Sequence, residues 1–370
     1  MQFNNLGKQW EIIREKSLEK IDQVGFQGSY INGPDVSKFE EEYSNHYGSR
    51  YSVGVSNGTD GLKLALQTYD LSNDDLVIMP ANTFVADYLA VKHLPLVKPK
   101  VALIDHNDYF TMDVDHLESF LKNVREKYNK VVVIPVHLYG QPCDMDRIVD
   151  LSILYNFHIL EDCSQSHEST YKNKMLGSFG DMAVYSLYPG KNLGAIGDAG
   201  IITTNDEKIY QRLKSIRNYG SKVKYHYDEL GHNNRLDTIQ SIVLLEKLKY
   251  ISSWTDSKIK ISNRFLSLIN NPKVTLPQIP EYTTKHSFHI FCVMVEDRKS
   301  FELHLSEAGI PTIIHYPIPF YKTKVWDVEN DIIFSSSNTD SSCDKIISIP
   351  LHPFLEEDEI NTIINTINKY

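Results

Sequence analysis

One lysine stands where a nucleophilic amine could be held. Lys191 lies in the turn Ser186-Leu-Tyr-Pro-Gly-Lys-Asn-Leu-Gly194, directly after an apolar stretch. A lysine in a crevice beside apolar or cationic groups loses its proton more readily and can then attack a carbonyl carbon. The segment therefore offers the amine that a Schiff base requires, although Lys191 taken alone could equally be a solvated loop lysine.

Two other segments offer partners for such chemistry. Glu161 and Asp162 end the apolar stretch 157–160, and a carboxylate there faces the crevice where open α/β sheets bind ligands. Gly58 and Thr59 open an apolar helix, whose free N–H groups and dipole favour phosphate. Each signal is weak alone. The acids could be a helix cap, and the Gly-Thr turn has neither dinucleotide-fingerprint nor Walker-loop spacing.

The three features together match what pyridoxal 5'-phosphate needs from a protein. Its phosphate needs backbone donors, its pyridine nitrogen needs a carboxylate, and its aldehyde needs a lysine amine.

The elements that would position these groups alternate between strands and helices. We expect strands at 52–55, 76–79, 101–104, 131–136, 157–160, 182–186 and 200–203. Such alternation predicts an α/β fold with a mostly parallel sheet covered on both faces. We expect helices at 7–25, 36–47 and 236–251. A strand at 286–295 and helices at 298–308 and 358–370 then predict a second, smaller α/β domain, so we divide the chain into residues 1–252 and 253–370.

Composition excludes several other classes. The net charge of -10 argues against nucleic-acid binding, which needs dense Lys and Arg. No apolar run approaches the roughly 20 residues that cross a bilayer, and no signal peptide opens the chain, so we expect a cytoplasmic protein with no membrane partner. Its four cysteines, without zinc-like spacing, predict buried reduced thiols and no metal site.

From about residue 25 onward the chain resembles a known family. The matching stretches, in the family's order, are Val53-Gly-Val-Ser-Asn-Gly-Thr-Asp60, Pro80-Ala-Asn-Thr-Phe-Val-Ala86, Pro135-Val-His-Leu-Tyr-Gly-Gln-Pro142, Glu161-Asp-Cys-Ser-Gln-Ser-His167, Gly177-Ser-Phe-Gly-Asp181, the Lys191 turn, Gly231-His-Asn-Asn-Arg-Leu-Asp237 and His315-Tyr-Pro-Ile-Pro319. They resemble the DegT/DnrJ/EryC/StrS sugar aminotransferases, which make amino sugars for antibiotics and bacterial surface polysaccharides. The resemblance implies an aspartate-aminotransferase-like fold (fold type I) with a seven-stranded sheet, and pyridoxal phosphate as cofactor.

The resemblance also implies roles for individual residues. Lys191 would hold the cofactor and then, as a free amine, carry a proton between the sugar carbon and the cofactor. Asp162 would pair with the pyridine nitrogen, Gln165 with the ring hydroxyl, and Phe84 would stack on the ring. The phosphate would be bound by Gly58, Thr59 and Ser186, and by Asn233 of a neighbouring subunit, which implies a homodimer with active sites at the subunit interface.

Four positions depart from the family pattern. Ser164 and Glu168 replace small residues, Ala199 replaces a common Gly, and Gly61 replaces a common Ala. None is implied to touch the cofactor, but Glu168 leaves the backbone after Gln165 in doubt.

Within the family, the segments most similar to enzymes that aminate C3 of a dTDP-linked 3-keto-6-deoxyhexose are Tyr219 to Lys222, Lys224-Tyr225 and residues 231–237. The implied product is a dTDP-3-amino-3,6-dideoxyhexose, with L-glutamate as amino donor. Tyr188, His315 and Tyr316 would lie near the sugar, although His315 and Tyr316 could merely pack a loop. We expect structural hydrogen bonding for His137 and His167.

Three alternatives stay open at this point. The sugar could be a 4-keto isomer aminated at C4. A dehydratase of the same fold is disfavoured, because a histidine replaces the Schiff-base lysine in those relatives. A non-enzymatic regulatory or binding module would need a DNA-binding extension or a lost catalytic residue, and neither is visible.

Overall fold

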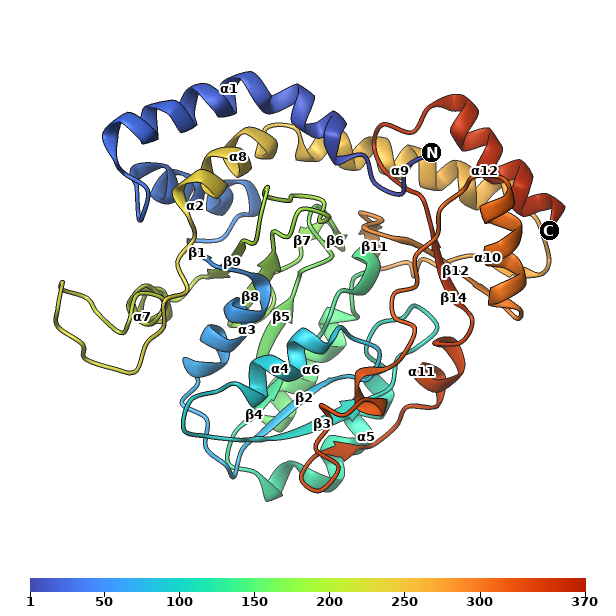
Figure 1. The fold of residues 1–370 in the computed structure, drawn as a ribbon. Helices are drawn as coiled ribbons and strands as arrows, with labels where there is room; N and C mark the ends of the chain where they lie inside the picture. The colour runs from blue at the N-terminus through green and yellow to red at the C-terminus, as the bar shows by residue number, and fades with distance from the viewer.

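The computed structural model describes residues 1–370 and is built around an eight-stranded sheet (Figure 1). Its strands, in spatial order, are β1 (Tyr51–Val55), β9 (Gly200–Thr204), β8 (Met182–Ser186), β5 (His158–Asp162), β4 (Val131–Val133), β2 (Leu76–Pro80), β3 (Lys100–Ile104) and β13 (Ile332–Ile333). Only β9 runs against the others. The predicted fold class is confirmed, and all seven expected strands lie in this sheet. The eighth strand, β13, comes from the C-terminal part and was not expected.

Helices cover both faces of the sheet, each over its own apolar core. On one face lie α2 (Pro34–Tyr47), α5 (Val114–Val124), α6 (Met145–Tyr155) and α8 (Thr238–Leu248), with α1 (Leu6–Gln27) packed on α8. On the other lie α3 (Gly58–Gln67), α4 (Val85–Lys92) and α7 (Glu207–Ile216). Strand β2 shows why the sequence gives this arrangement. Leu76 and Ile78 enter the first core while Val77 and Met79 enter the second, as expected of a strand buried on both faces.

The C-terminal part has an antiparallel sheet and a core of its own. This sheet runs β10 (Val274–Thr275), β12 (Phe291–Val295) and β14 (Ile346–Ile349). Around it pack α9 (Ile251–Leu268), α10 (Arg298–Glu307) and α12 (Glu357–Lys369), and α11 (Ser337–Ser342) lies nearby. A third small sheet joins β11 (Thr283–Lys285) to β6 (Thr170–Tyr171) and β7 (Lys174–Met175). The division at residue 252 stays a prediction, and that residue lies in the first turn of α9.

Two expected elements differ from the structure. The expected helix 236–251 is the helix α8, which ends at Leu248, and a second helix α9 follows from Ile251. The expected strand 286–295 is only β12, from Phe291, because the residues before it are bonded to other segments; the Ser287 N–H, for example, donates to Ser169 Oγ at 3.1 Å. None of the helices combines the length and apolar character needed to span a bilayer.

Candidate active site

The parallel strands carry the expected site residues to one edge of the sheet. Strands β1, β2, β5 and β8 point the same way, so their carboxyl ends meet at that edge. Asp162 is the last residue of β5, and the segments that follow β1, β2 and β8 carry Gly58, Phe84 and Lys191 respectively. Residues far apart in the sequence are thereby brought to one edge of the sheet, where open α/β sheets have their ligand-binding cleft.

The start of α3 presents a backbone surface with almost no room for a side chain. Gly58 is buried, and a Cβ added there would lie 2.9 Å from Ser186 Cβ and 3.2 Å from Ser186 Cα. Asn57 caps the helix by accepting the Asp60 N–H at 2.8 Å. The first N–H groups of a helix have no partner within it, so those of Gly58 and Thr59 are free to bind an anion beside Ser186.

Lys191 is a half-buried amine rather than a solvated loop lysine. Its turn is closed by a hydrogen bond from the Lys191 N–H to the Tyr188 carbonyl, 2.9 Å long. Burial lowers the pKa of Lys191 to about 8, although the nearby carboxyl groups of Asp162 and Asp87 act in the opposite direction. About a tenth of the amine is therefore neutral at pH 7 and about half at pH 8, and the neutral form is the one that acts as a nucleophile or proton carrier.

The two acids that end β5 have separate surroundings. Both oxygens of Glu161 accept backbone N–H groups of the 177–180 turn, and its Oε2 lies 3.2 Å from His137 Nε2. Glu161 is therefore structural. Asp162 is also buried, and its Oδ1 accepts the Ser164 N–H at 2.9 Å. Its other oxygen, Oδ2, accepts no N–H donor of this chain and can take another partner.

One side of the site is formed by three side chains in contact, those of Gln165, Tyr316 and Phe84. Gln165 Nε2 donates to the Tyr316 hydroxyl at 3.1 Å, and its Oε1 accepts the Tyr139 N–H at 2.8 Å. The Tyr316 ring lies 5.1 Å from that of Phe84, whose side chain is about half exposed. An aromatic face and an amide thus lie together beside Asp162, where a planar ring could sit.

Three other residues were expected to act in the site, His315, Tyr188 and Asn233. His315 Nδ1 lies 2.9 Å from Ser348 Oγ, and burial together with the charge of Lys191 lowers its pKa to about 4. Tyr188 is 58% exposed. Asn233 is exposed, and its backbone bridges to Asn218 without bringing the side chain into the cleft of its own chain. The roles assigned to these residues stay predictions.

Two residues of the site were missed in the sequence. Tyr139, besides bonding Gln165, donates its hydroxyl to the His315 carbonyl. Asp87 is fully buried, and its carboxyl group lies close enough to influence both Lys191 and Tyr316. The only signal for Asp87 was an acid directly after the Pro80–Ala86 stretch, at the start of a mostly apolar helix.

The two expected structural histidines behave differently. His137 accepts the Cys143 N–H at Nδ1, 3.1 Å away, as expected for structural hydrogen bonding. The expectation for His167 is wrong, because neither ring nitrogen has a partner. The ring lies instead among Tyr43, Tyr47 and Tyr185, and burial lowers its pKa to about 3.

The departures from the family pattern have local explanations. Gly61 packs against β8, and a Cβ there would lie 2.9 Å from Val184 Cγ1. Glu168 adopts a left-handed backbone (φ 69°), which suits glycine, but its carboxylate lies 2.6 Å from His46 Nε2 and accepts the Ser252 hydroxyl at 2.9 Å. Ser164 contributes only its N–H to Asp162.

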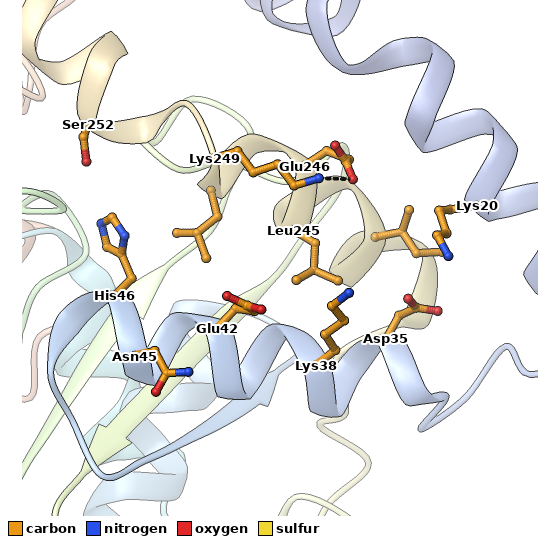
Figure 2. Close-up of a pocket in the computed structure, with 12 residues that line it drawn as sticks. Lys20, Asp35, Lys38, Glu42, Asn45, His46, Leu245, Glu246, Lys249 and Ser252 are labelled. Atoms are coloured by element: carbon orange, nitrogen blue, oxygen red, sulfur yellow. Dashed lines mark hydrogen bonds and ion pairs between the residues drawn. The ribbon is translucent and has the colours of Figure 1, made fainter.

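His46 and Ser252 also line a surface groove of about 560 Å³ between α2 and α8 (Figure 2). Charged side chains of both signs surround it, and Lys249 and Glu246 pair at 2.6 Å on its rim. It contains none of the residues expected to act on a ligand, so we place the active site in the cleft at the strand ends.

The groups in the cleft are those that an enzyme would need to react through a lysine amine and hold a phosphorylated ring. The close glycine at a helix start, the buried carboxylate and the lysine with a lowered pKa suit the phosphate, the pyridine nitrogen and the aldehyde of pyridoxal phosphate respectively. The sequence profile of the DegT/DnrJ/EryC1/StrS aminotransferase family matches residues 11–368, and the chain belongs to this family. The predicted resemblance and the predicted aminotransferase class are confirmed.

Individual relatives agree with the family. A dTDP-3-amino-3,6-dideoxy-alpha-D-galactopyranose transaminase of Aneurinibacillus thermoaerophilus is 36% identical, with 96% of each chain covered. A dTDP-3-amino-3,4,6-trideoxy-alpha-D-glucose transaminase of Streptomyces venezuelae is 33% identical over 100% of this chain and 95% of the relative. The solved structure of a family member from Brucella abortus superposes with a TM-score of 0.93 at 30% identity, covering 100% of this chain and 99% of that one.

Proposed function

We propose that the protein transfers an amino group from L-glutamate to C3 of a dTDP-linked 3-keto-6-deoxyhexose, with pyridoxal phosphate as cofactor. The observation that carries the proposal is the meeting of Lys191 and the buried Asp162 in one cleft, with the pKa of Lys191 lowered to about 8 by burial. The choice of C3 and of dTDP is supported by two relatives that are named as transaminases of dTDP-linked 3-amino sugars.

The chain's own residues would hold the cofactor at both ends. Gly58, Thr59 and Ser186 would bind the phosphate through the start of α3. Asp162 would accept a hydrogen bond from the protonated pyridine nitrogen, and Gln165 would contact the ring hydroxyl. When bound, the cofactor supplies an aldehyde that captures amines and a ring that accepts electrons.

Lys191 would act as the catalytic base and acid. As a neutral amine it would take the proton from the α-carbon of glutamate and, in the second half of the cycle, deliver a proton to C3 of the sugar. The same amine would face both substrates, so Lys191 in one position could serve both halves. Tyr188, His315 and Tyr316 would contact the sugar.

We further propose that the active unit is a homodimer. Large apolar side chains near the cleft are exposed in the single chain, among them Phe84 (49%) and Tyr188 (58%). The segment between α7 and α8, which leads to the exposed Asn233, projects away from the body (Figure 1). A second copy of the chain would cover the exposed side chains of Phe84 and Tyr188. It would also receive Asn233 of the first copy in its own cleft.

The test measures 2-oxoglutarate release from L-glutamate by the cofactor-loaded protein. Three reactions are compared: a dTDP-3-keto-6-deoxyhexose, its 4-keto isomer and no sugar. We expect release with the 3-keto sugar only. Release with the 4-keto isomer alone would leave Lys191 and the cofactor in place but would move the amination to C4. No release with either sugar would refute the proposed substrate class.

The matched control is Lys191→Ala, which removes the amine that moves the proton. We expect almost no turnover from this variant, and near-normal turnover would contradict the assigned role. The cytoplasmic location stays a proposal, supported by four buried free thiols, which are typical of a reducing compartment.

A further inference from the structure

A second carboxyl group, Asp87, lies beside the acid assigned to the pyridine nitrogen. Asp87 is in the first turn of α4 and is fully buried. Its Oδ2 accepts a hydrogen bond from the Thr83 hydroxyl, and its Oδ1 has no donor in the chain. A buried carboxylate oxygen without a donor is costly, and this one needs a physical reason.

Asp162 supplies that reason. The side chains of Asp87 and Asp162 are within hydrogen-bonding reach of each other. Two ionised carboxylates in contact away from water repel strongly, so such a pair keeps one proton between them. The shared proton turns the unpartnered Asp87 oxygen into a donor, and the two acids then form one hydrogen-bonded unit.

The surroundings assign the proton to Asp87. Asp162 accepts the Ser164 N–H at 2.9 Å and lies near Lys191, whereas no N–H of the chain donates to the Asp87 carboxyl. The hydrogen bond from the Thr83 hydroxyl and the position in the first turn of α4 act to lower the pKa of Asp87. Burial and the charge of Asp162 outweigh them and raise the pKa of Asp87 well above its usual range. The other titratable groups near Asp87 are Lys191 and Tyr316.

We propose that Asp87 is a positioning residue: a protonated carboxylic acid that donates a hydrogen bond to Asp162 and holds its carboxylate toward the pyridine nitrogen of the cofactor. The pair then carries a single negative charge, which matches a single pyridinium. The proton stays on Asp87, and no bond to carbon forms or breaks there. This inference rests on the proposed cofactor and deepens the assignment of Asp162.

Two substitutions separate the hydrogen bond from the charge. Asp87→Asn is close in shape to the protonated acid, is neutral, and can still donate to Asp162. Asp87→Leu has similar bulk and no donor. For each protein we would measure the infrared C=O band of a protonated carboxylic acid at neutral pH without cofactor, and the Kd for pyridoxal phosphate by absorbance titration.

We expect the acid band in the wild-type protein and its loss in both variants. Asp87→Asn should bind the cofactor within about threefold of wild type. Asp87→Leu should bind it about tenfold more weakly, the loss expected for one hydrogen bond to a charged group. Thermal unfolding of the cofactor-free proteins checks that each variant folds. If Asp87→Leu does not fold, the infrared band of the wild-type protein and the cofactor Kd of Asp87→Asn still test the inference.

Two results would overturn the inference. One is a wild-type protein without the acid band, since both carboxyls would then be ionised. The other is Asp87→Asn with a large loss of cofactor affinity, since the negative charge of Asp87 would then be needed. Neither measurement uses a sugar, so failure of the proposed reaction and failure of this inference are distinguished.

Discussion

Replacing Gly58 with alanine tests whether the start of α3 binds the cofactor phosphate. The added Cβ would lie 2.9 Å from Ser186 Cβ and 3.2 Å from Ser186 Cα. The second of these atoms is backbone in β8 and cannot rotate away. The methyl group would therefore push the start of α3 away from Ser186 and separate the two sides of the expected phosphate site.

The size of the effect follows from the cost of overpacking a close contact. Inserting a methyl group into well-packed surroundings costs about 1–3 kcal/mol. If this strain is relieved by moving the phosphate-binding N–H groups, the Kd for pyridoxal phosphate should rise about 5- to 150-fold, at roughly 1.4 kcal/mol per tenfold. Absorbance titration of the cofactor-free protein measures this Kd.

Pyridoxal, which lacks the phosphate, is the discriminating ligand. It should bind Gly58→Ala and wild type with similar affinity, because the change lies at the phosphate end. Gly25→Ala is the matched control, since a Cβ there meets nothing within 4 Å and the helix α1 should gain slightly in stability. Equal losses of pyridoxal and pyridoxal phosphate affinity in Gly58→Ala would refute the phosphate assignment.

Three further predictions concern charge and packing. Because burial lowers the pKa of Lys191 to about 8, the capture of pyridoxal phosphate followed by stopped-flow absorbance should accelerate up to about pH 8 and then level; a rate still rising at pH 10 would contradict the lowered pKa. Burial acts to raise the pKa of Glu168, but His46 outweighs it and holds that pKa below the ordinary 4.5. The stability advantage of wild type over Glu168→Gln should therefore be complete above that pH and shrink as pH falls further, in urea unfolding at several pH values; an advantage independent of pH would count against the charge. Gly61→Ala should destabilise by about 1–3 kcal/mol, and Val184→Ala should offset part of that loss; additive losses in urea unfolding would show that the contact is not the cause.

The sequence predicted those parts of the fold that depend on local pattern. The strands of the large sheet are short apolar runs between helical segments, and such runs are recognisable because both faces of each strand are buried. The residues at the strand ends could be predicted for the same reason, since parallel strands place their carboxyl ends at one edge. Lys191 and Asp162 were found in this way.

What the sequence could not predict depends on contacts between distant segments. The apolar spacing of α8 continues across Tyr250 into α9, so periodicity alone joined two helices into one. Strand β13 has two residues and owes its position to its partner β3. Asp87 could not be identified from the sequence, because nothing in its local sequence shows that Asp162 lies close to it.

The departures from the family pattern show how a substitution can be compensated by its neighbours. Glu168 stands at a left-handed backbone position, which costs a non-glycine residue about 1–2 kcal/mol. Its carboxylate, however, joins His46 of α2 to Ser252 of α9. Hydrogen bonds to a buried charged group contribute roughly 1.5–3 kcal/mol each, so the contacts can offset the backbone strain. The same carboxylate would be a liability in a chain without those partners, because it would be buried and unpaired. The effect of Glu168 therefore depends on His46 and Ser252. The sequence left the backbone after Gln165 in doubt, and in the structure this backbone is a left-handed turn held by the two contacts of the Glu168 carboxylate.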